Sequence, residues 1–104
     1  LTLPSVFQLH CYADSDSLND PRGLVTFQQI MDDLCDLLKI TDASSAKRTL
    51  QQLMVDLGVE PSMLKLGVTT KQQRRFLSEH VNIERLKNNP LKLSSEHIEA
   101  IFEL

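Results

Sequence analysis

The chain has 104 residues, a formal net charge of −3 and an apolar content of 41%. That apolar content is too high for a disordered segment, and the mildly acidic balance argues against a nucleic-acid partner, whose phosphate backbone needs a basic excess. No apolar run reaches the roughly 20 residues of a membrane span. The totals therefore predict one soluble domain, residues 1–104, with neither nucleic acid nor a membrane as partner.

The two cysteines, Cys11 and Cys35, fit neither a metal-binding spacing nor a redox Cys-x-x-Cys motif. We therefore expect a reducing cytoplasm and no disulfide, with Cys35 serving as a small core residue. Residues 1–9 lack the basic start and the small-residue cleavage site of a signal peptide. Leu1 is not a methionine, and the chain is predicted to begin inside a helix, so we expect a fragment of a larger protein.

The first half of the chain is predicted to contain three helices. Residues 3–10 have spacing compatible with a buried helical segment that starts or kinks at Pro4. A polar loop follows over residues 13–23, and Thr26 is then expected to cap a helix. The apolar stripe of that helix is Phe27, Ile30, Met31, Leu34, Cys35, Leu37 and Leu38. Thr41-Asp42 begins a third helix, which Gly58 ends. Its stripe is Ala43, Ala46, Leu50, Leu53, Met54 and Leu57.

The second half is predicted to form shorter helices. Residues 62–66 form one turn closed by Gly67, and a capping box at Thr69, with Gln72 three residues later, starts the next helix. The inner face of that helix is Phe76, Leu77 and Val81. A short helix over residues 82–87 is stopped by Asn88-Asn89-Pro90, because the residue before a proline is pushed out of helical geometry.

The last predicted helix is capped by Ser94, and its core face is Ile98, Ile101, Phe102 and Leu104. No stretch shows convincing strand alternation. The fold class is therefore all-α, an irregular bundle of about five to six helices.

Reactive constellations are missing from the sequence. His10, His80 and His97 are scattered, with no partner at ligand spacing, and there is no glycine-rich phosphate loop. The basic cluster Lys71, Arg74 and Arg75 is interpreted as a solvated face; its alternative, the recognition helix of a DNA-binding helix-turn-helix, is opposed by the net charge. By itself the chain is not expected to be a catalyst.

The order of the helix stops and starts, however, resembles the C-terminal helical domain of the iron-containing (group III) alcohol dehydrogenases. The segments that carry the resemblance are Leu3-Pro4-Ser5-Val6, Asp56-Leu57-Gly58-Val59-Glu60-Pro61, Met63-Leu64 with Leu66-Gly67-Val68, Asn88-Asn89-Pro90 and Leu93-Ser94-Ser95-Glu96. The order of these segments, with Asn88-Asn89-Pro90 before a capped last helix, carries the resemblance. The resemblance covers essentially the whole chain and implies the C-terminal domain of a dehydroquinate synthase-like fold.

The resemblance implies an NAD(P)-dependent, metal-dependent enzyme that reduces aldehydes, of which this chain is one part. In that family an N-terminal domain holds NAD(P), and a divalent metal, iron or zinc, is held by one Asp and three His. Both groups are expected outside this chain, since no histidine here matches a ligand motif. The implied partners are the missing N-terminal domain and further copies in a homo-oligomer. The isolated chain is expected to self-associate through the apolar surface that the missing helices would cover.

The resemblance also places residues 83–89 at the mouth of the substrate pocket, with Arg85 and Asn89 as the expected substrate-binding residues. Many family members carry small residues there, whereas this segment is most similar to the branch that reduces phosphonoacetaldehyde. A guanidinium can hold a phosphonate or carboxylate with two parallel hydrogen bonds. The competing interpretation is that Arg85 pairs with Glu84 or Asp56, or covers apolar surface with its stem.

A second hypothesis is a stand-alone helical protein-interaction or regulatory domain without catalysis. The upstream coding sequence would discriminate the two, because a dinucleotide-binding domain and metal-ligand motifs there would favour the dehydrogenase.

Overall fold

A computed structural model describes residues 2–102, so Leu1 and Leu104, whose roles at the chain ends were predicted above, lie outside the described residues. The described part contains six α-helices and one 3₁₀ helix. They are α1 (Leu3–Cys11), α2 (Leu24–Leu38), η1 (Ala43–Ser45), α3 (Ala46–Asp56), α4 (Lys71–Glu79), α5 (Ile83–Leu86) and α6 (Ser95–Ile101). Among residues 2–102 the sole strand-like feature is an isolated antiparallel bridge between Leu18 and Leu91. The predicted all-α fold class is confirmed.

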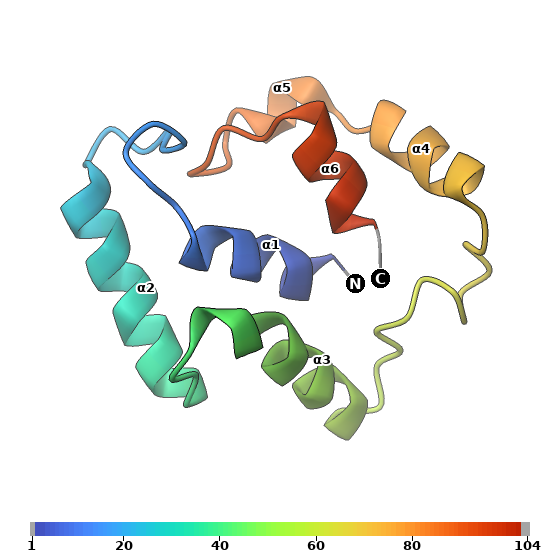
Figure 1. Ribbon diagram of the computed structural model, residues 1–104, viewed down its shortest axis with the longest axis horizontal. Coiled ribbons are helices and arrows are strands. Elements are labelled where there is room, and N and C mark those ends of the chain that lie inside the picture. Colours follow the sequence, from blue (N-terminus) through green and yellow to red (C-terminus); the bar gives the residue numbers. More distant parts are fainter. Residues whose placement is uncertain (1, 103–104) are drawn as a thin grey trace.

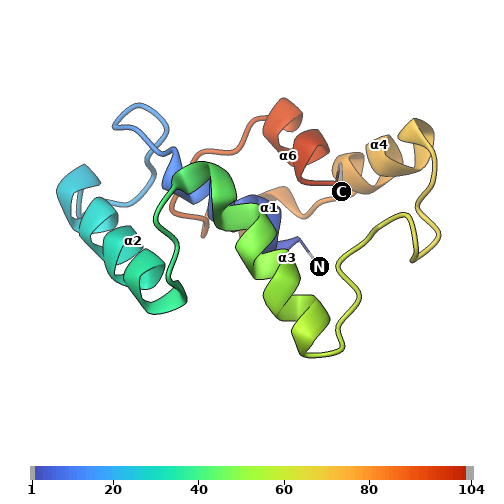
Figure 2. The same ribbon diagram turned by 60° about the horizontal axis from the view of Figure 1, so that its bottom comes forward.

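The helices form a thin, irregular arrangement. In Figure 1, α1 lies at the centre, with α3 below it, α2 to the left and α4 and α6 to the upper right, and Figure 2 shows α3 passing in front of α1. The main helix contacts are α1 with α3 and α4 with α6. The molecule measures 39 × 32 × 19 Å, so its thinnest dimension corresponds to about two helix diameters. None of the helices in the described part is long and apolar enough to cross a membrane.

Several predicted helix ends are confirmed. Asp42 accepts a hydrogen bond from the backbone N–H of Ser44 at the start of η1, and Ser94 accepts one from His97 at the start of α6. α3 ends at Asp56, and Gly58 follows with a φ of +77°, a left-handed conformation that glycine adopts without the steric penalty of a Cβ. Pro4 lies in the first turn of α1, where its missing N–H costs no helical hydrogen bond.

Two predicted helix starts are wrong, one by three residues and one by a single residue. α2 begins at Leu24 directly after Gly23, so Thr26 lies inside the helix and does not cap it. The capping box of α4 is formed by Thr70 and Gln73, not by Thr69 and Gln72. Glycine is also a favoured residue at the position before a helix, and at α4 the two adjacent threonines offer the same cap chemistry, so the path of the preceding loop decides which one is used.

The core lies between α1, α2 and α3. Its buried side chains come from these three helices, from Ile40 just after α2 and from Leu91 before α6. The full set is Phe7, Phe27, Met31, Ile40, Ala46, Leu50 and Leu91. These residues confirm the inner part of the predicted stripes on α2 and α3. Leu91 is important for the site below, because it anchors the turn after α5 in the same core.

Other residues of the predicted stripes are exposed. Leu37 is 76% exposed on α2, Leu57 is 71% exposed after α3, and Phe76 is 59% exposed on α4, so the prediction that these side chains are buried is wrong for this chain. The physical reason is that the flat arrangement of residues 2–102 leaves one side of each of these segments without a packing partner in the described part of the chain.

Candidate functional site

The turn after α5 holds both residues that were predicted to bind a substrate. Asn82 caps α5 by accepting a hydrogen bond from the backbone N–H of Arg85. Two backbone hydrogen bonds then close the turn, from Asn88 N–H to the Arg85 carbonyl (3.1 Å) and from Asn89 N–H to the Leu86 carbonyl (3.0 Å). The short helix and its turn therefore fix the backbone that carries Arg85 and Asn89.

Asn89 is the central anchor of this turn. Its side-chain oxygen accepts a hydrogen bond from the backbone N–H of Leu91 (2.9 Å) and lies 3.2 Å from Nε2 of His10 in α1. Because the amide oxygen can only accept, the contact with His10 is a hydrogen bond when Nε2 carries the proton. The Asn89 side chain thus joins the turn to α1, and its predicted contact with a substrate stays a prediction.

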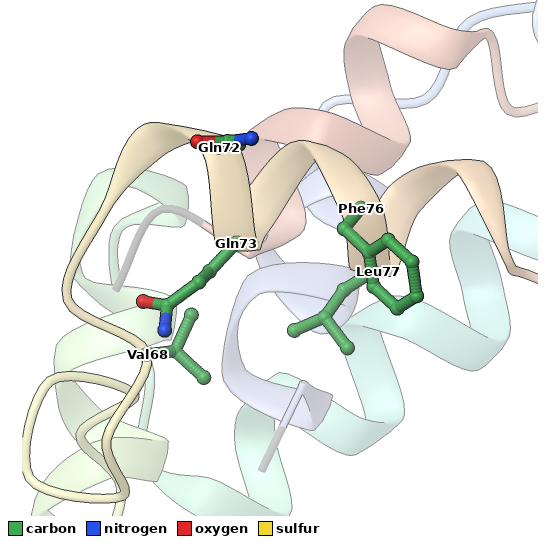
Figure 3. Close-up of a pocket in the computed structure, with 5 residues that line it drawn as sticks. All are labelled: Val68, Gln72, Gln73, Phe76 and Leu77. Carbon is green, nitrogen blue, oxygen red and sulfur yellow. The ribbon is translucent and has the colours of Figure 1, made fainter.

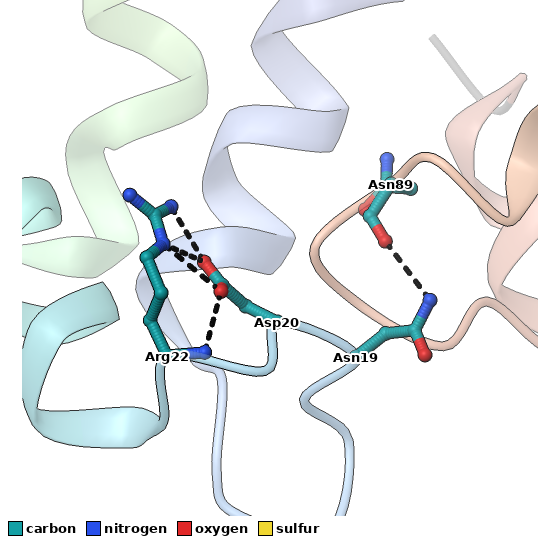
Figure 4. Close-up of polar contacts among 4 residues, drawn as sticks. All are labelled: Asn19, Asp20, Arg22 and Asn89. Carbon is teal, nitrogen blue, oxygen red and sulfur yellow. Dashed lines mark hydrogen bonds and ion pairs between the residues drawn. The ribbon is translucent and has the colours of Figure 1, made fainter.

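A loop from the first half of the chain supports the turn from the other side. The side-chain amide of Asn19 donates to the Lys87 carbonyl (3.1 Å) and, at 3.5 Å, to the Asn89 carbonyl; Figure 4 draws this second contact. The backbone N–H of Asn19 donates to the Pro90 carbonyl (2.6 Å), and that of Lys92 donates to Ser17 (2.7 Å). Residues 17–19 and 87–92 therefore form one hydrogen-bonded unit.

The same loop is closed by an ion pair. Arg22 donates from Nε and Nη2 to the two carboxylate oxygens of Asp20 at 2.7–3.1 Å, and its backbone N–H donates to the same carboxylate at 2.9 Å (Figure 4). These hydrogen bonds lower the pKa of Asp20 and keep it ionised. The pair stiffens the loop just before α2, next to the residues that contact the turn.

Arg85 differs from Asn89 in being exposed. Neither of the two carboxylates considered as its partners holds it: Glu84 pairs with Lys87 at 3.1 Å, and Asp56 accepts a hydrogen bond from Gln52 at 2.8 Å. Within residues 2–102 the guanidinium of Arg85 makes no hydrogen bond or ion pair. The structure does not join the side chains of Arg85 and Asn89; it places them at the two ends of one fixed turn.

His10 is the functional neighbour that sequence reasoning missed. Burial lowers the pKa of His10, and the hydrogen bond to Asn89 opposes this shift without cancelling it. Its ring also meets Phe27 edge-on, with 5.8 Å between ring centroids. His10 and Asn89 are 79 positions apart, so no local motif could have linked them. The result is a neutral imidazole that links α1, the core and the turn.

A separate apolar hollow lies on α4, away from this turn. It has a volume of about 390 Å³ and is lined by Val68, Gln72, Gln73, Phe76 and Leu77, which Figure 3 shows as sticks. The Phe76 ring stacks on His80, with ring centroids 4.0 Å apart. The hollow is mainly apolar, and its lining residues carry no group with acid, base or nucleophilic chemistry.

The side chains of the described part offer no metal centre: no group of three or more His, Cys, Asp or Glu among residues 2–102 is arranged to hold a metal ion. Comparison with protein-family models, with curated proteins and with solved structures found no match to this chain.

Proposed function

We propose that this chain is the C-terminal helical part of an iron-type alcohol dehydrogenase, an NAD(P)- and metal-dependent enzyme that reduces an aldehyde. In this proposal the chain shapes the substrate pocket and selects an anionic aldehyde such as phosphonoacetaldehyde. The observation that carries the proposal is the exposed guanidinium of Arg85, which has no partner among residues 2–102 and extends from a turn anchored at Asn89.

The proposed role of Arg85 is to bind the charged end of the substrate. A guanidinium is planar and always charged near neutral pH, and it can donate two parallel hydrogen bonds to a phosphonate or carboxylate. The turn contributes by restricting where Arg85 can lie, since Asn19, Asn89 and Leu91 tie its backbone to α1 and to the core. Because the backbone of the turn is already ordered, only the side chain of Arg85 loses conformational freedom when the substrate binds.

The metal and the cofactor belong to the rest of the proposed enzyme. The donor groups in the described part of the chain do not fit a metal site, so no chemical step is assigned to these residues. Their proposed contribution is to bind and orient the aldehyde and to exclude water from the pocket.

The uncovered apolar faces support the proposal that further protein packs on this chain. Leu37, Leu57 and Phe76 belong to three different segments, and each is more than half exposed. In the proposal these faces are covered by the N-terminal domain of the same protein and by further copies in a homo-oligomer. Isolated from that cover, the chain would be expected to self-associate.

The proposal is tested by steady-state kinetics of the protein that the complete reading frame encodes. Arg85→Ala should raise KM for an anionic aldehyde by about one to two orders of magnitude, the scale of a lost charged hydrogen bond, and should leave KM for a neutral aldehyde of similar length unchanged. Arg85→Lys should recover part of the loss, because it restores the charge without the paired donors.

The matched control is Lys71→Ala, which removes an exposed positive charge from the start of α4. If Lys71→Ala and Arg85→Ala change the kinetics equally, the effect is one of overall charge. If Arg85→Ala changes KM by the same factor for anionic and neutral aldehydes, the proposed role of Arg85 is wrong.

A second candidate function is favoured by the hollow on α4. A stand-alone helical interaction domain would use Val68, Phe76 and Leu77 to receive an apolar side chain of another protein. The substitution Phe76→Ala would then abolish binding of that partner, and the complete protein would show no NAD(P)H-dependent reduction of any aldehyde.

A further inference from the structure

Two cysteines that are far apart in the sequence meet in the fold. Cys11 is the last residue of α1 and Cys35 lies in the last turn of α2, and both are free thiols of intermediate exposure. Both pack against the same core cluster. They also line the same open cleft, which has a volume of about 540 Å³, so small molecules in solution can reach them.

The thiols also interact with each other. The pKa of Cys11 is raised to about 11, first by burial and then by the nearby Cys35. An interaction of this kind requires the sulfur atoms to be close. Cys11 therefore keeps its proton near neutral pH, which makes it a poor attacking sulfur.

We propose that Cys11 and Cys35 are a reversible oxidation site that forms an intramolecular disulfide between α1 and α2, with a low-molecular-weight disulfide as the oxidant. The thiol state described above is its reduced form. The disulfide would close the loop that contains residues 17–19, which support the turn carrying Asn89. It would also fix the position of His10, the neighbour of Cys11 in α1.

The chemistry balances as two thiol–disulfide exchanges. The Cys35 thiolate attacks one sulfur of the oxidant, a new bond from that sulfur to Cys35 forms, and the first half of the oxidant leaves as a thiolate. Cys11 then gives up its proton and attacks the sulfur of Cys35, which forms the bond between the cysteines and expels the second half. The two cysteines lose two electrons, and the oxidant gains them and becomes two thiols that carry the two protons.

The charges on the cleft indicate which oxidants enter it. Its rim includes Asp32, Asp36 and Asp42, and hydrogen bonds from Ser44 lower the pKa of Asp42. These carboxylates repel an anionic disulfide and attract a cationic one, and salt screens the difference. Cystamine, which is cationic, should therefore react faster than glutathione disulfide, which is anionic.

The experiment is a redox titration of the purified chain with cystamine and its thiol, read by alkylation of free cysteines and by mass spectrometry. The wild-type chain should lose both alkylatable thiols together and lose the mass of two hydrogen atoms. Cys11→Ser and Cys35→Ser should instead retain one bound half of the oxidant. The equilibrium constant for the disulfide should be about tenfold or more higher in the folded chain than in denaturant, because the fold brings the thiols together.

Three results would overturn the proposal. One is that both thiols remain alkylatable under oxidising conditions. Another is that oxidation stops at mixed disulfides or links separate chains. The third is an equilibrium constant that is no higher in the folded chain than in denaturant. The measurement on the wild-type chain decides the question even if a serine variant fails to fold.

Discussion

The two halves of the chain are held together in different ways. Helices α1, α2 and α3 share a core of buried side chains, whereas neither α4 nor α5 has a buried side chain. The second half buries Met63, Leu91 and Ile101, and it is also held by helix caps, by the packing of α6 on α4 and by the hydrogen bonds between residues 17–19 and 87–92. Burial thus contributes most in one half, and directional polar contacts contribute more to the position of the other.

Because of this difference, the residues that stabilise the fold and the residues with a proposed function lie mostly in different halves of the chain. The half with the core supplies a rigid support, and the half with little burial presents Arg85 and the apolar face of α4. Regions with few buried contacts open more easily than a core does, so α4 and α5 should be the parts that gain most from a covering protein. Substitutions that act on one half and spare the other test this contrast.

The largest effect is expected from a matched pair of phenylalanines. Phe27→Ala removes a ring that is 5% exposed and should lower the free energy of unfolding by about 3–5 kcal/mol. Phe76→Ala removes a ring that is 59% exposed and should cost about 1 kcal/mol or less, mainly the stacking on His80. Urea unfolding followed by circular dichroism measures both. Equal losses would show that α4 is as well packed as α2.

The next effect is expected at the anchor between the halves. Asn89→Ala removes the acceptor shared by His10 and the backbone N–H of Leu91 and should cost about 1–3 kcal/mol. Asn88→Ala is the control, since Asn88 is exposed, and it should change stability by less than about 0.5 kcal/mol. Hydrogen exchange should accelerate at residues 87–92 in the first variant alone. If hydrogen exchange at residues 87–92 is unchanged in Asn89→Ala, Asn89 does not anchor the turn.

A smaller and more local effect is expected at the start of α4. Thr70→Ala removes the side-chain oxygen that accepts from Gln73 N–H, at a cost of about 1 kcal/mol. Because α4 has no buried side chain, the loss should appear as faster exchange within α4 and leave α1–α3 unaffected. Thr69→Ala is the matched control and should hardly change the stability or the hydrogen exchange of α4. A stronger effect at Thr69 would mean that the helix starts one residue earlier.

The smallest effect is a pH dependence from His10. Its pKa in the folded chain is lowered from 6.5, so the unfolded chain takes up a proton before the folded chain does as the pH falls. Stability should therefore decrease as the pH falls through 6.5 and level off below the folded pKa. Unfolding measured from about pH 7.5 to about pH 5.5 should show this slope in the wild type and less of it in His10→Gln. Identical slopes would exclude His10 as its source.

Local signals in the sequence were sufficient to predict that the helices exist and roughly where they end. They were insufficient to predict the contacts between the helices. Pro4, Gly58, Asn82 and Ser94 mark helix ends through their own side chains or backbone preferences, and the structure uses all four. The capping prediction failed at Thr26, because α2 begins after Gly23, and at Thr69, because the loop before α4 selects the adjacent Thr70 as the cap.

Contacts over long distances could not be predicted in the same way. The contact of His10 with Asn89 and the proximity of Cys11 to Cys35 depend on how α1 and α2 meet the rest of the chain. The sequence also did not predict that Phe76 is exposed. An apolar stripe indicates which face of a helix is to be covered, but it does not indicate whether the same chain or another protein covers it. The role of Arg85 came from a family resemblance and remains a proposal.

The most direct test of the proposed function is an activity measurement on the protein encoded by the complete reading frame. Purified with a divalent metal and supplied with NADH or NADPH, it should reduce phosphonoacetaldehyde and should prefer it to a neutral aldehyde of similar length. If the loaded protein oxidises neither cofactor with any anionic aldehyde, this chain is not part of an alcohol dehydrogenase of this kind.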